Sequence, residues 1–102
     1  MLAFFKKLLG KPAINYKELV TNGAIIIDVR SMAEFKSGHI AGSKNFPVDN
    51  IRSKINELKK MGKPVITVCR SGARSGMAKS ILRSAGIEVY NGGAWTSLKN
   101  KL

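Results

Sequence analysis

The chain has 102 residues, of which 44% are apolar, and this size and composition predict one domain with a single modest core. Its 18 Lys and Arg residues against 6 Asp and Glu residues give a net charge of +12, which favours anionic substrates, but the basic residues are scattered and we expect no nucleic-acid partner. One Cys excludes an internal disulfide, and one Cys with one His argues against a metal site.

Residues 1–12 form an N-terminal amphipathic extension ahead of a domain that we expect to span residues 13–102. The apolar face of its first turns carries Met1, Phe4, Phe5, Leu8 and Leu9. This stretch is shorter than the ~20 residues that cross a bilayer, and Lys6 and Lys7 interrupt the apolar run of an export signal, so we expect a cytoplasmic protein. We expect the extension to pack on the domain; weak contact of residues 1–9 with a membrane surface, or with a partner, is the alternative.

The next stretches predict short elements in alternation. Ala13-Ile14 is an expected edge strand, and Asn15 caps the helix that follows it. Residues 24–29 form an apolar, β-branched run without alternation, which is typical of a parallel strand covered by helices on both faces. Further along, Asp49 or Asn50 is expected to cap a helix whose apolar face consists of Ile51, Ile55 and Leu58.

Charged and polar residues follow the strand at 24–29. Ser31 and Glu34 form a capping box that opens a short helix. Asp28, Arg30 and Glu34 are candidate catalytic residues, but we expect them to hold one another and nearby backbone in place, because an unpaired buried charge is costly. His39, the only histidine, is a candidate general base for a cysteine; we favour a structural hydrogen bond.

The central stretch runs from a buried strand through a short loop into a helix. Residues 65–68 are apolar or β-branched, and Cys69 follows at the carboxyl end, where open α/β sheets place ligands. The apolar face of the helix is expected to comprise Met77, Ala78, Ile81, Leu82 and Ala85. Gly86 ends that helix.

The loop after Cys69 favours negative charge. A loop that curls ahead of a helix points backbone N–H groups inward, Gly72 permits a positive φ, and Arg70 and Arg74 add permanent positive charge. The pKa of a thiol there should fall from ~8.5 to between roughly 3.5 and 7.5. The pattern therefore predicts a thiolate nucleophile in an anion cradle; a buried structural cysteine is the alternative.

The C-terminal part predicts a strand at residues 87–90, a turn at Asn91-Gly92-Gly93 and a last helical turn at residues 94–98. Trp95 lies either at the mouth of a pocket or in the core. Together these elements predict an α/β fold, with a three-layer parallel sheet of four or five strands and helices on both faces.

Four stretches, in the right order over about residues 13–98, resemble the rhodanese family of sulfurtransferases. They are Cys69-Arg70-Ser71-Gly72-Ala73-Arg74, Asp28-Val29-Arg30 with Glu34-Phe35, the segment from Gly38 to Pro47, and Gly92-Gly93 with Trp95. Ser43 stands where alanine is more usual. The likeness predicts a single-domain rhodanese.

This resemblance implies that a sulfane sulfur moves from an anionic donor such as thiosulfate to cyanide, a cellular thiol or a protein acceptor, through a persulfide on Cys69. The implied substrate-binding residues are Arg70, Ser71, Gly72, Ala73, Arg74 and Ser75. Arg70 and Arg74 favour thiosulfate over mercaptopyruvate, because relatives that prefer the latter usually carry glycine and threonine there. The scheme needs no metal and no other cofactor.

Two other functions fit the same loop. A persulfide carrier or interaction module would deliver sulfur to a partner protein with little turnover of small donors. Phosphatases and arsenate reductases also carry a loop from cysteine to arginine, but with five intervening residues, whereas four separate Cys69 from Arg74. The shorter loop favours a sulfur atom over a tetrahedral phosphate.

Overall fold

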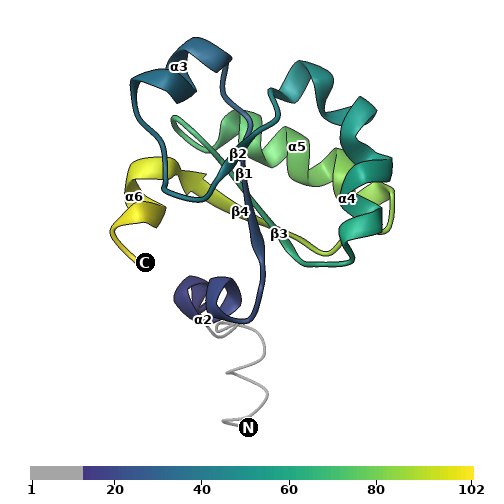
Figure 1. Ribbon diagram of the computed structural model, residues 1–102, viewed down its shortest axis with the longest axis horizontal. Coiled ribbons are helices and arrows are strands. Elements are labelled where there is room, and N and C mark those ends of the chain that lie inside the picture. Colours follow the sequence, from purple (N-terminus) through teal and green to yellow (C-terminus); the bar gives the residue numbers. More distant parts are fainter. Residues whose placement is uncertain (1–12) are drawn as a thin grey trace, which may run out of the picture.

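A computed structural model describes residues 13–102, and the expected extension at residues 1–12 lies outside the described residues (Figure 1). The described residues form a four-stranded, wholly parallel sheet with the strand order β2-β1-β3-β4. Its strands are β1 (Ile25–Asp28), β2 (Lys44–Asn45), β3 (Val65–Cys69) and β4 (Val89–Ala94). No helix within this part of the chain is long and apolar enough to cross a bilayer.

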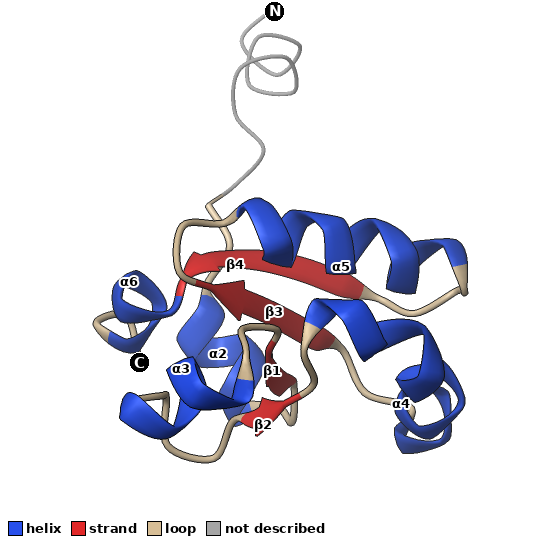
Figure 2. Ribbon diagram, turned by 90° about the horizontal axis from the view of Figure 1, so that it is seen from above, coloured by secondary structure: helices blue, strands red, loops and turns tan. Residues whose placement is uncertain are grey.

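Helices cover both faces of the sheet. They are α2 (Tyr16–Thr21), α3 (Met32–Ser37), the 3₁₀ helix η1 (Val48–Lys54), α4 (Ile55–Met61), α5 (Ala73–Ser84) and α6 (Trp95–Lys99). Residues of η1, α4 and α5 pack on one face, and residues of α2 and α6 pack on the other. Figure 2 shows α5 and α2 on opposite sides of the strands. The predicted three-layer α/β fold is confirmed.

The core is divided between the two faces because successive side chains of a strand point in opposite directions. In β1, Ile27 is buried against η1, α4 and α5, whereas its neighbour Ile26 is buried with Leu98 of α6. The same division occurs in β3, where Val65 faces α5 and Ile66 faces α6. A strand buried on both sides needs no polar alternation, which explains the continuous apolar runs in the sequence.

Four expectations about local structure are wrong. Ala13-Ile14 is not a strand, and Ile14 is 46% exposed. The helix expected after Asp49 or Asn50 begins instead as η1 behind Pro47, without a side-chain cap, and becomes α-helical only at Ile55.

Met77 is 59% exposed rather than buried on the apolar face of α5. The side of α5 that meets the sheet is centred on Ser75, Ala78 and Leu82, so Met77 lies beyond its edge.

The turn expected at Asn91-Gly92-Gly93 is also wrong, because these residues belong to β4. The register between β3 and β4 shifts after Thr67. This shift marks a β-bulge in β4 that contains Gly92. A Cβ atom at Gly92 would lie 2.9 Å from Cγ2 of Ile66 and 3.0 Å from Cγ1 of Val68. The glycine therefore permits close contact between strands rather than a reversal of the chain.

Asp28 and Arg30 form a buried ion pair at the carboxyl end of β1. Nη2 of Arg30 lies 2.7 Å from Oδ2 of Asp28 and donates a second hydrogen bond, of 2.6 Å, to the carbonyl of Gly38. The guanidinium also lies over the ring of Trp95, 4.7 Å from its centroid. These contacts tie β1 to the segment after α3 and to the start of α6, which supports the architectural interpretation of the pair.

We predict that Arg30→Leu destabilises the fold by about 3–5 kcal/mol, because Asp28 would remain buried without its partner. The measurement is urea unfolding followed by circular dichroism. Arg52→Leu is the matched control; Arg52 is exposed on η1, and its loss should change the free energy of unfolding by no more than about 0.5 kcal/mol. Equal unfolding midpoints for the two variants would contradict the architectural role.

Candidate active site

Cys69 is the last residue of the central strand β3, and its side chain is held under the loop that follows. The residue is 1% exposed. Its Sγ accepts a hydrogen bond of 2.9 Å from the N–H of Gly72 and lies 3.3 Å from Oγ of Ser75. Donors from the loop and from the first turn of α5 therefore converge on the sulfur; a loop amide was expected there from the sequence, whereas the Ser75 hydroxyl was not.

The curl of the loop depends on Gly72, which is the N-cap of α5 and has φ +103°. An L side chain rarely adopts this backbone conformation. Gly72 also lies close to the bulge of β4, since a Cβ atom there would be 3.6 Å from Cα of Gly93. The positive φ expected from the sequence is confirmed, and it turns the N–H of this residue towards the sulfur.

The protonation of Cys69 reflects two opposed effects. Burial raises the pKa of the thiol, because an apolar environment disfavours the charged form. Hydrogen bonds from the Ser75 hydroxyl and from the amides of Ser75, Gly72 and Ser71 lower the pKa and outweigh burial. The net pKa lies below its ordinary value, so the site stabilises a thiolate.

Ser75 connects the thiol to β4. Its hydroxyl is fully buried and donates a hydrogen bond of 2.7 Å to Oδ1 of Asn91. The side-chain amide of Asn91 donates in turn to the carbonyl of Gly72, at 3.3 Å. Asn91 was not predicted as a site residue, because a glycine pair after asparagine indicates a turn. Its position two residues after the buried Val89 was the available signal that it belongs to a strand.

The two arginines of the loop have different surroundings. Arg74 is held by Glu34 of α3 through hydrogen bonds of 2.7 and 3.0 Å, whereas Arg70 is exposed. Glu34 thus pairs with Arg74, and only its backbone carbonyl contacts Arg30, in contrast to the expected grouping with Asp28 and Arg30.

The ion pair with Arg74 lowers the pKa of Glu34 to about 2. A carboxyl whose pKa is lower in the folded state stabilises the fold above its unfolded pKa. The contribution of Glu34 is therefore complete above its ordinary pKa of 4.5 and is lost as the pH falls towards about 2.

His39 contacts Phe35 of α3. Its ring stacks on Phe35, with centroids 3.7 Å apart, and Nδ1 lies 2.8 Å from the carbonyl of Phe35. Among the described residues this is its only hydrogen bond, which supports the structural interpretation. Trp95 is partly buried and packs on the α2–α6 side of the core.

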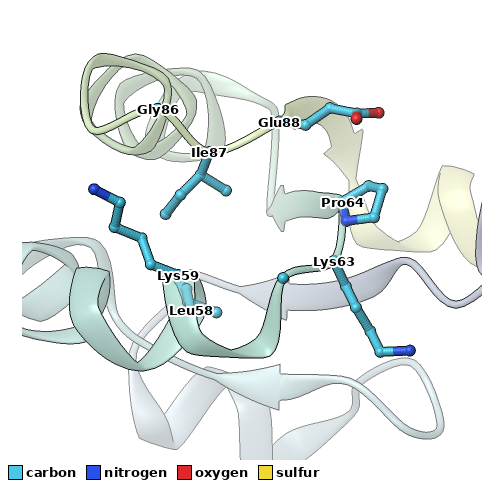
Figure 3. A pocket seen from close by; sticks show the side chains of 8 residues that line it. Leu58, Lys59, Lys63, Pro64, Gly86, Ile87 and Glu88 are labelled. Carbon is cyan, nitrogen blue, oxygen red and sulfur yellow. The ribbon is translucent and has the colours of Figure 1, made fainter.

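Two cavities help to locate the site. The cavity in Figure 3 has a volume of about 260 Å³ and lies where β3 and β4 begin, at the end of the sheet opposite to Cys69. Its polar lining consists of Lys59, Lys63 and Glu88, without a cysteine. A second cavity of about 310 Å³ is lined by Arg74, Met77 and residues that follow β1 and β2, so it opens beside the loop.

The described residues therefore bring together one ionisable thiol, three amides and a hydroxyl, and near them an exposed guanidinium. This arrangement is suited to nucleophilic attack and to holding a negatively charged sulfur afterwards. No group of three or more His, Cys, Asp or Glu side chains within residues 13–102 is arranged to hold a metal ion.

Comparison with known proteins agrees with this geometry. The family model of the rhodanese-like domain matches residues 11–98. The uncharacterized protein YqhL of Bacillus subtilis is 42% identical over 69 residues, which cover 67% of this chain and 54% of YqhL. The thiosulfate sulfurtransferase GlpE of Ectopseudomonas mendocina is 32% identical over 88 residues, which cover 85% of this chain and 77% of GlpE.

A solved structure of a rhodanese with anions from E. coli superposes with a TM-score of 0.66 at 29% identity. The superposition covers 72% of this chain and 89% of that structure. The chain thus spans most of the length of that rhodanese and of GlpE, and about half the length of YqhL.

We predict that Ser75→Ala raises the pKa of Cys69, because the thiolate loses the hydroxyl donor while burial is unchanged. The measurement is the rate of alkylation by iodoacetamide as a function of pH. Ser71→Ala is the matched control, since Ser71 acts on the sulfur through its backbone amide, which alanine keeps. A similar pKa in the Ser75→Ala variant and the unmodified chain would show that the hydroxyl does not stabilise the thiolate.

Proposed function

This chain belongs to the rhodanese-like domain family, and on that premise we propose that it is a sulfurtransferase that carries a sulfane sulfur on Cys69. The observation that supports this proposal most directly is that the Gly72 amide and the Ser75 hydroxyl both contact the sulfur of Cys69, the only cysteine in the sequence. A thiol in this position has both the lowered pKa of a nucleophile and donors for an anionic product.

In the first step, the thiolate of Cys69 attacks the outer sulfur of thiosulfate. A bond forms between the two sulfur atoms, the sulfur–sulfur bond of thiosulfate breaks, and its electron pair leaves with sulfite. The enzyme then carries a persulfide with one negative charge, so atoms and charge balance. The loop amides at 70–75, together with the helix start behind them, are suited to stabilise that charge.

In the second step, an acceptor nucleophile attacks the outer sulfur of the persulfide. Cyanide gives thiocyanate, and a thiolate gives a new persulfide; in both cases Cys69 leaves as the thiolate and is ready for another cycle. The sequence of donor and acceptor reactions is ping-pong and requires no metal or organic cofactor. We place this reaction in the cytoplasm, where cellular thiols can serve as acceptors.

The positive charge for the donor comes mainly from Arg70 in this proposal. Arg70 is exposed next to Cys69, so its guanidinium is available to a dianion such as thiosulfate. Arg74 already pairs with Glu34, and we assign it a second role, which is to hold the first turn of α5 against α3. This division refines the expectation that both arginines bind the donor.

A persulfide carrier that serves a partner protein is the second candidate. The observation that favours it is the burial of the sulfur, which is 1% exposed and so meets a bulky small-molecule acceptor less easily than a shaped partner surface. A high persulfide yield with slow turnover on all small thiols would favour the carrier. Hydrolysis of a phosphate ester would instead favour the phosphatase alternative.

We predict that thiosulfate adds the mass of one sulfur atom to the unmodified chain and that Cys69→Ala takes up none. Cys69→Ala should also lack thiosulfate:cyanide activity while it keeps its unfolding midpoint, because the side chain provides the nucleophile. Mass spectrometry of the intact protein and thiocyanate detection check the two results. Residual activity in the folded variant would overturn the assignment.

We predict that Arg70→Ala raises the KM for thiosulfate about fivefold, the scale of one exposed charge, with a smaller change in kcat. Arg83→Ala is the matched control, because Arg83 is an exposed arginine in the last turn of α5. Initial rates over a range of thiosulfate concentrations at fixed cyanide give both constants. An equal effect of the two substitutions would mean that general surface charge, rather than Arg70, attracts the donor.

A further inference from the structure

The side chain of Asn91 occupies a fixed orientation beside the candidate site. Its Oδ1 accepts two hydrogen bonds, from the N–H of Gly93 at 2.9 Å and from the hydroxyl of Ser75 at 2.7 Å. Its Nδ2 donates to the carbonyl of Gly72 at 3.3 Å. Because a backbone N–H only donates and a backbone carbonyl only accepts, the oxygen must face Ser75 and the amide nitrogen must face the loop.

The backbone around Asn91 is equally constrained. The hydroxyl of Tyr16 in α2 donates to the carbonyl of Asn91 at 3.1 Å, and the residue is paired with Thr67 of β3. A Cβ atom at Gly76 would lie 3.3 Å from Nδ2 of Asn91, so this glycine in the first turn of α5 leaves the space that the amide occupies. The acceptor for Ser75 is therefore built into the sheet.

Ser75 has one hydroxyl proton and two neighbours that can accept it. Oδ1 of Asn91 lies at 2.7 Å and Sγ of Cys69 at 3.3 Å. While the proton points to Asn91, a lone pair of Ser75 faces the sulfur and can accept the S–H proton of a thiol. A thiolate has no proton to donate, so the same lone pair would then face a negative charge, and the hydroxyl must rotate towards the sulfur.

We propose that Asn91 is a positioning residue that competes with Cys69 for the hydroxyl proton of Ser75 and thereby restrains the thiol from ionising. Ser75 transfers no proton in this scheme; its hydroxyl only rotates, and the proton of the thiol leaves to solvent. Once the persulfide forms, the negative charge moves to the outer sulfur, and the hydroxyl is free to return to Asn91.

The charged groups around Cys69 do not account for such a competition. They are Arg70 on the loop, Arg74 of α5 with its partner Glu34 of α3, and the pair Asp28 and Arg30 at the end of β1. None of these side chains forms a hydrogen bond with Asn91 or Ser75, so a substitution at Asn91 leaves their charges in place. Within residues 13–102, the uncharged hydroxyl of Ser75 is the only side-chain group with hydrogen-bond contacts to both Asn91 and the sulfur.

The test is a double-mutant cycle on the pKa of Cys69, measured as iodoacetamide alkylation against pH. Asn91→Ala removes the competing acceptor, so we expect the pKa of Cys69 to fall by about half a unit or more. At a pH below that pKa, the rate of alkylation should then rise about threefold or more. In the Ser75→Ala background the same substitution should not lower the pKa, because no hydroxyl proton remains to redirect and the bond lost from Nδ2 to the Gly72 carbonyl only supports the loop. An effect of equal size in both backgrounds would overturn the proposal, as would a raised or unchanged pKa in Asn91→Ala.

Asn91→Leu provides a second variant without the acceptor that fills more of the space. A measurement on the unmodified chain completes the test: the side-chain carbonyl carbon of Asn91 should shift in the NMR spectrum with the titration of Cys69, and this shift should be absent in Ser75→Ala. A carbonyl signal that stays constant through the titration would overturn the proposal even if both Asn91 variants fail to fold.

The inference rests on the proposed function only for its role in turnover, and the two can fail separately. Alkylation reports the ionisation of Cys69 without any sulfur donor. A chain that takes up no sulfur from thiosulfate, but shows the expected cycle, contradicts the sulfurtransferase and retains the role of Asn91. A chain that forms the persulfide, but shows no coupling between Ser75 and Asn91, contradicts the positioning role alone.

Discussion

The structure of the site depends on one hydrogen bond, from the N–H of Gly72 to the sulfur of Cys69. A backbone amide can reach back to a side chain three residues earlier only if the chain curls tightly, and the positive φ of Gly72 makes that curl possible. The same curl starts α5, so the helix begins beside the sulfur of Cys69. It also brings the loop close to β4, since a Cβ atom at Gly72 would lie 3.6 Å from Cα of Gly93.

Three neighbouring elements hold this curl in place. Ser75 of α5 and Asn91 of β4 connect the loop to the edge of the sheet, and the Arg74–Glu34 pair connects it to α3. The strand order places β3 between β1 and β4, so the loop after β3 receives support from both sides. The hydrogen-bonded sulfur of Cys69 thus lies at the end of a rigid strand, where small displacements of the loop are opposed by several contacts at once.

Much of the fold was predictable from the sequence, because buried parallel strands, capping boxes and a cysteine at a strand end are local signals. Ser31 and Glu34 form both halves of the expected box, and Gly72 has the expected conformation. The contacts that were missed join residues far apart in the chain. Glu34 and Arg74 are 40 positions apart and Ser75 and Asn91 are 16, and no local pattern predicts such pairs. Asn91 was assigned to a turn because two glycines follow it, whereas these glycines belong to a bulged strand.

The environment of Cys69 is better explained by chemistry than by packing. A cysteine that only fills space in a core needs no hydrogen-bond donors, and burial by itself would raise its pKa. Here the sulfur is 1% exposed, yet a hydroxyl and three amides of the loop and α5 lower the pKa despite that burial. Donors that replace water around a buried sulfur lower the energy of its anion and need no reorganisation during the reaction. The competition of Asn91 for the hydroxyl then supplies an opposing control, since an uncontested donor would leave a reactive thiolate in the resting protein.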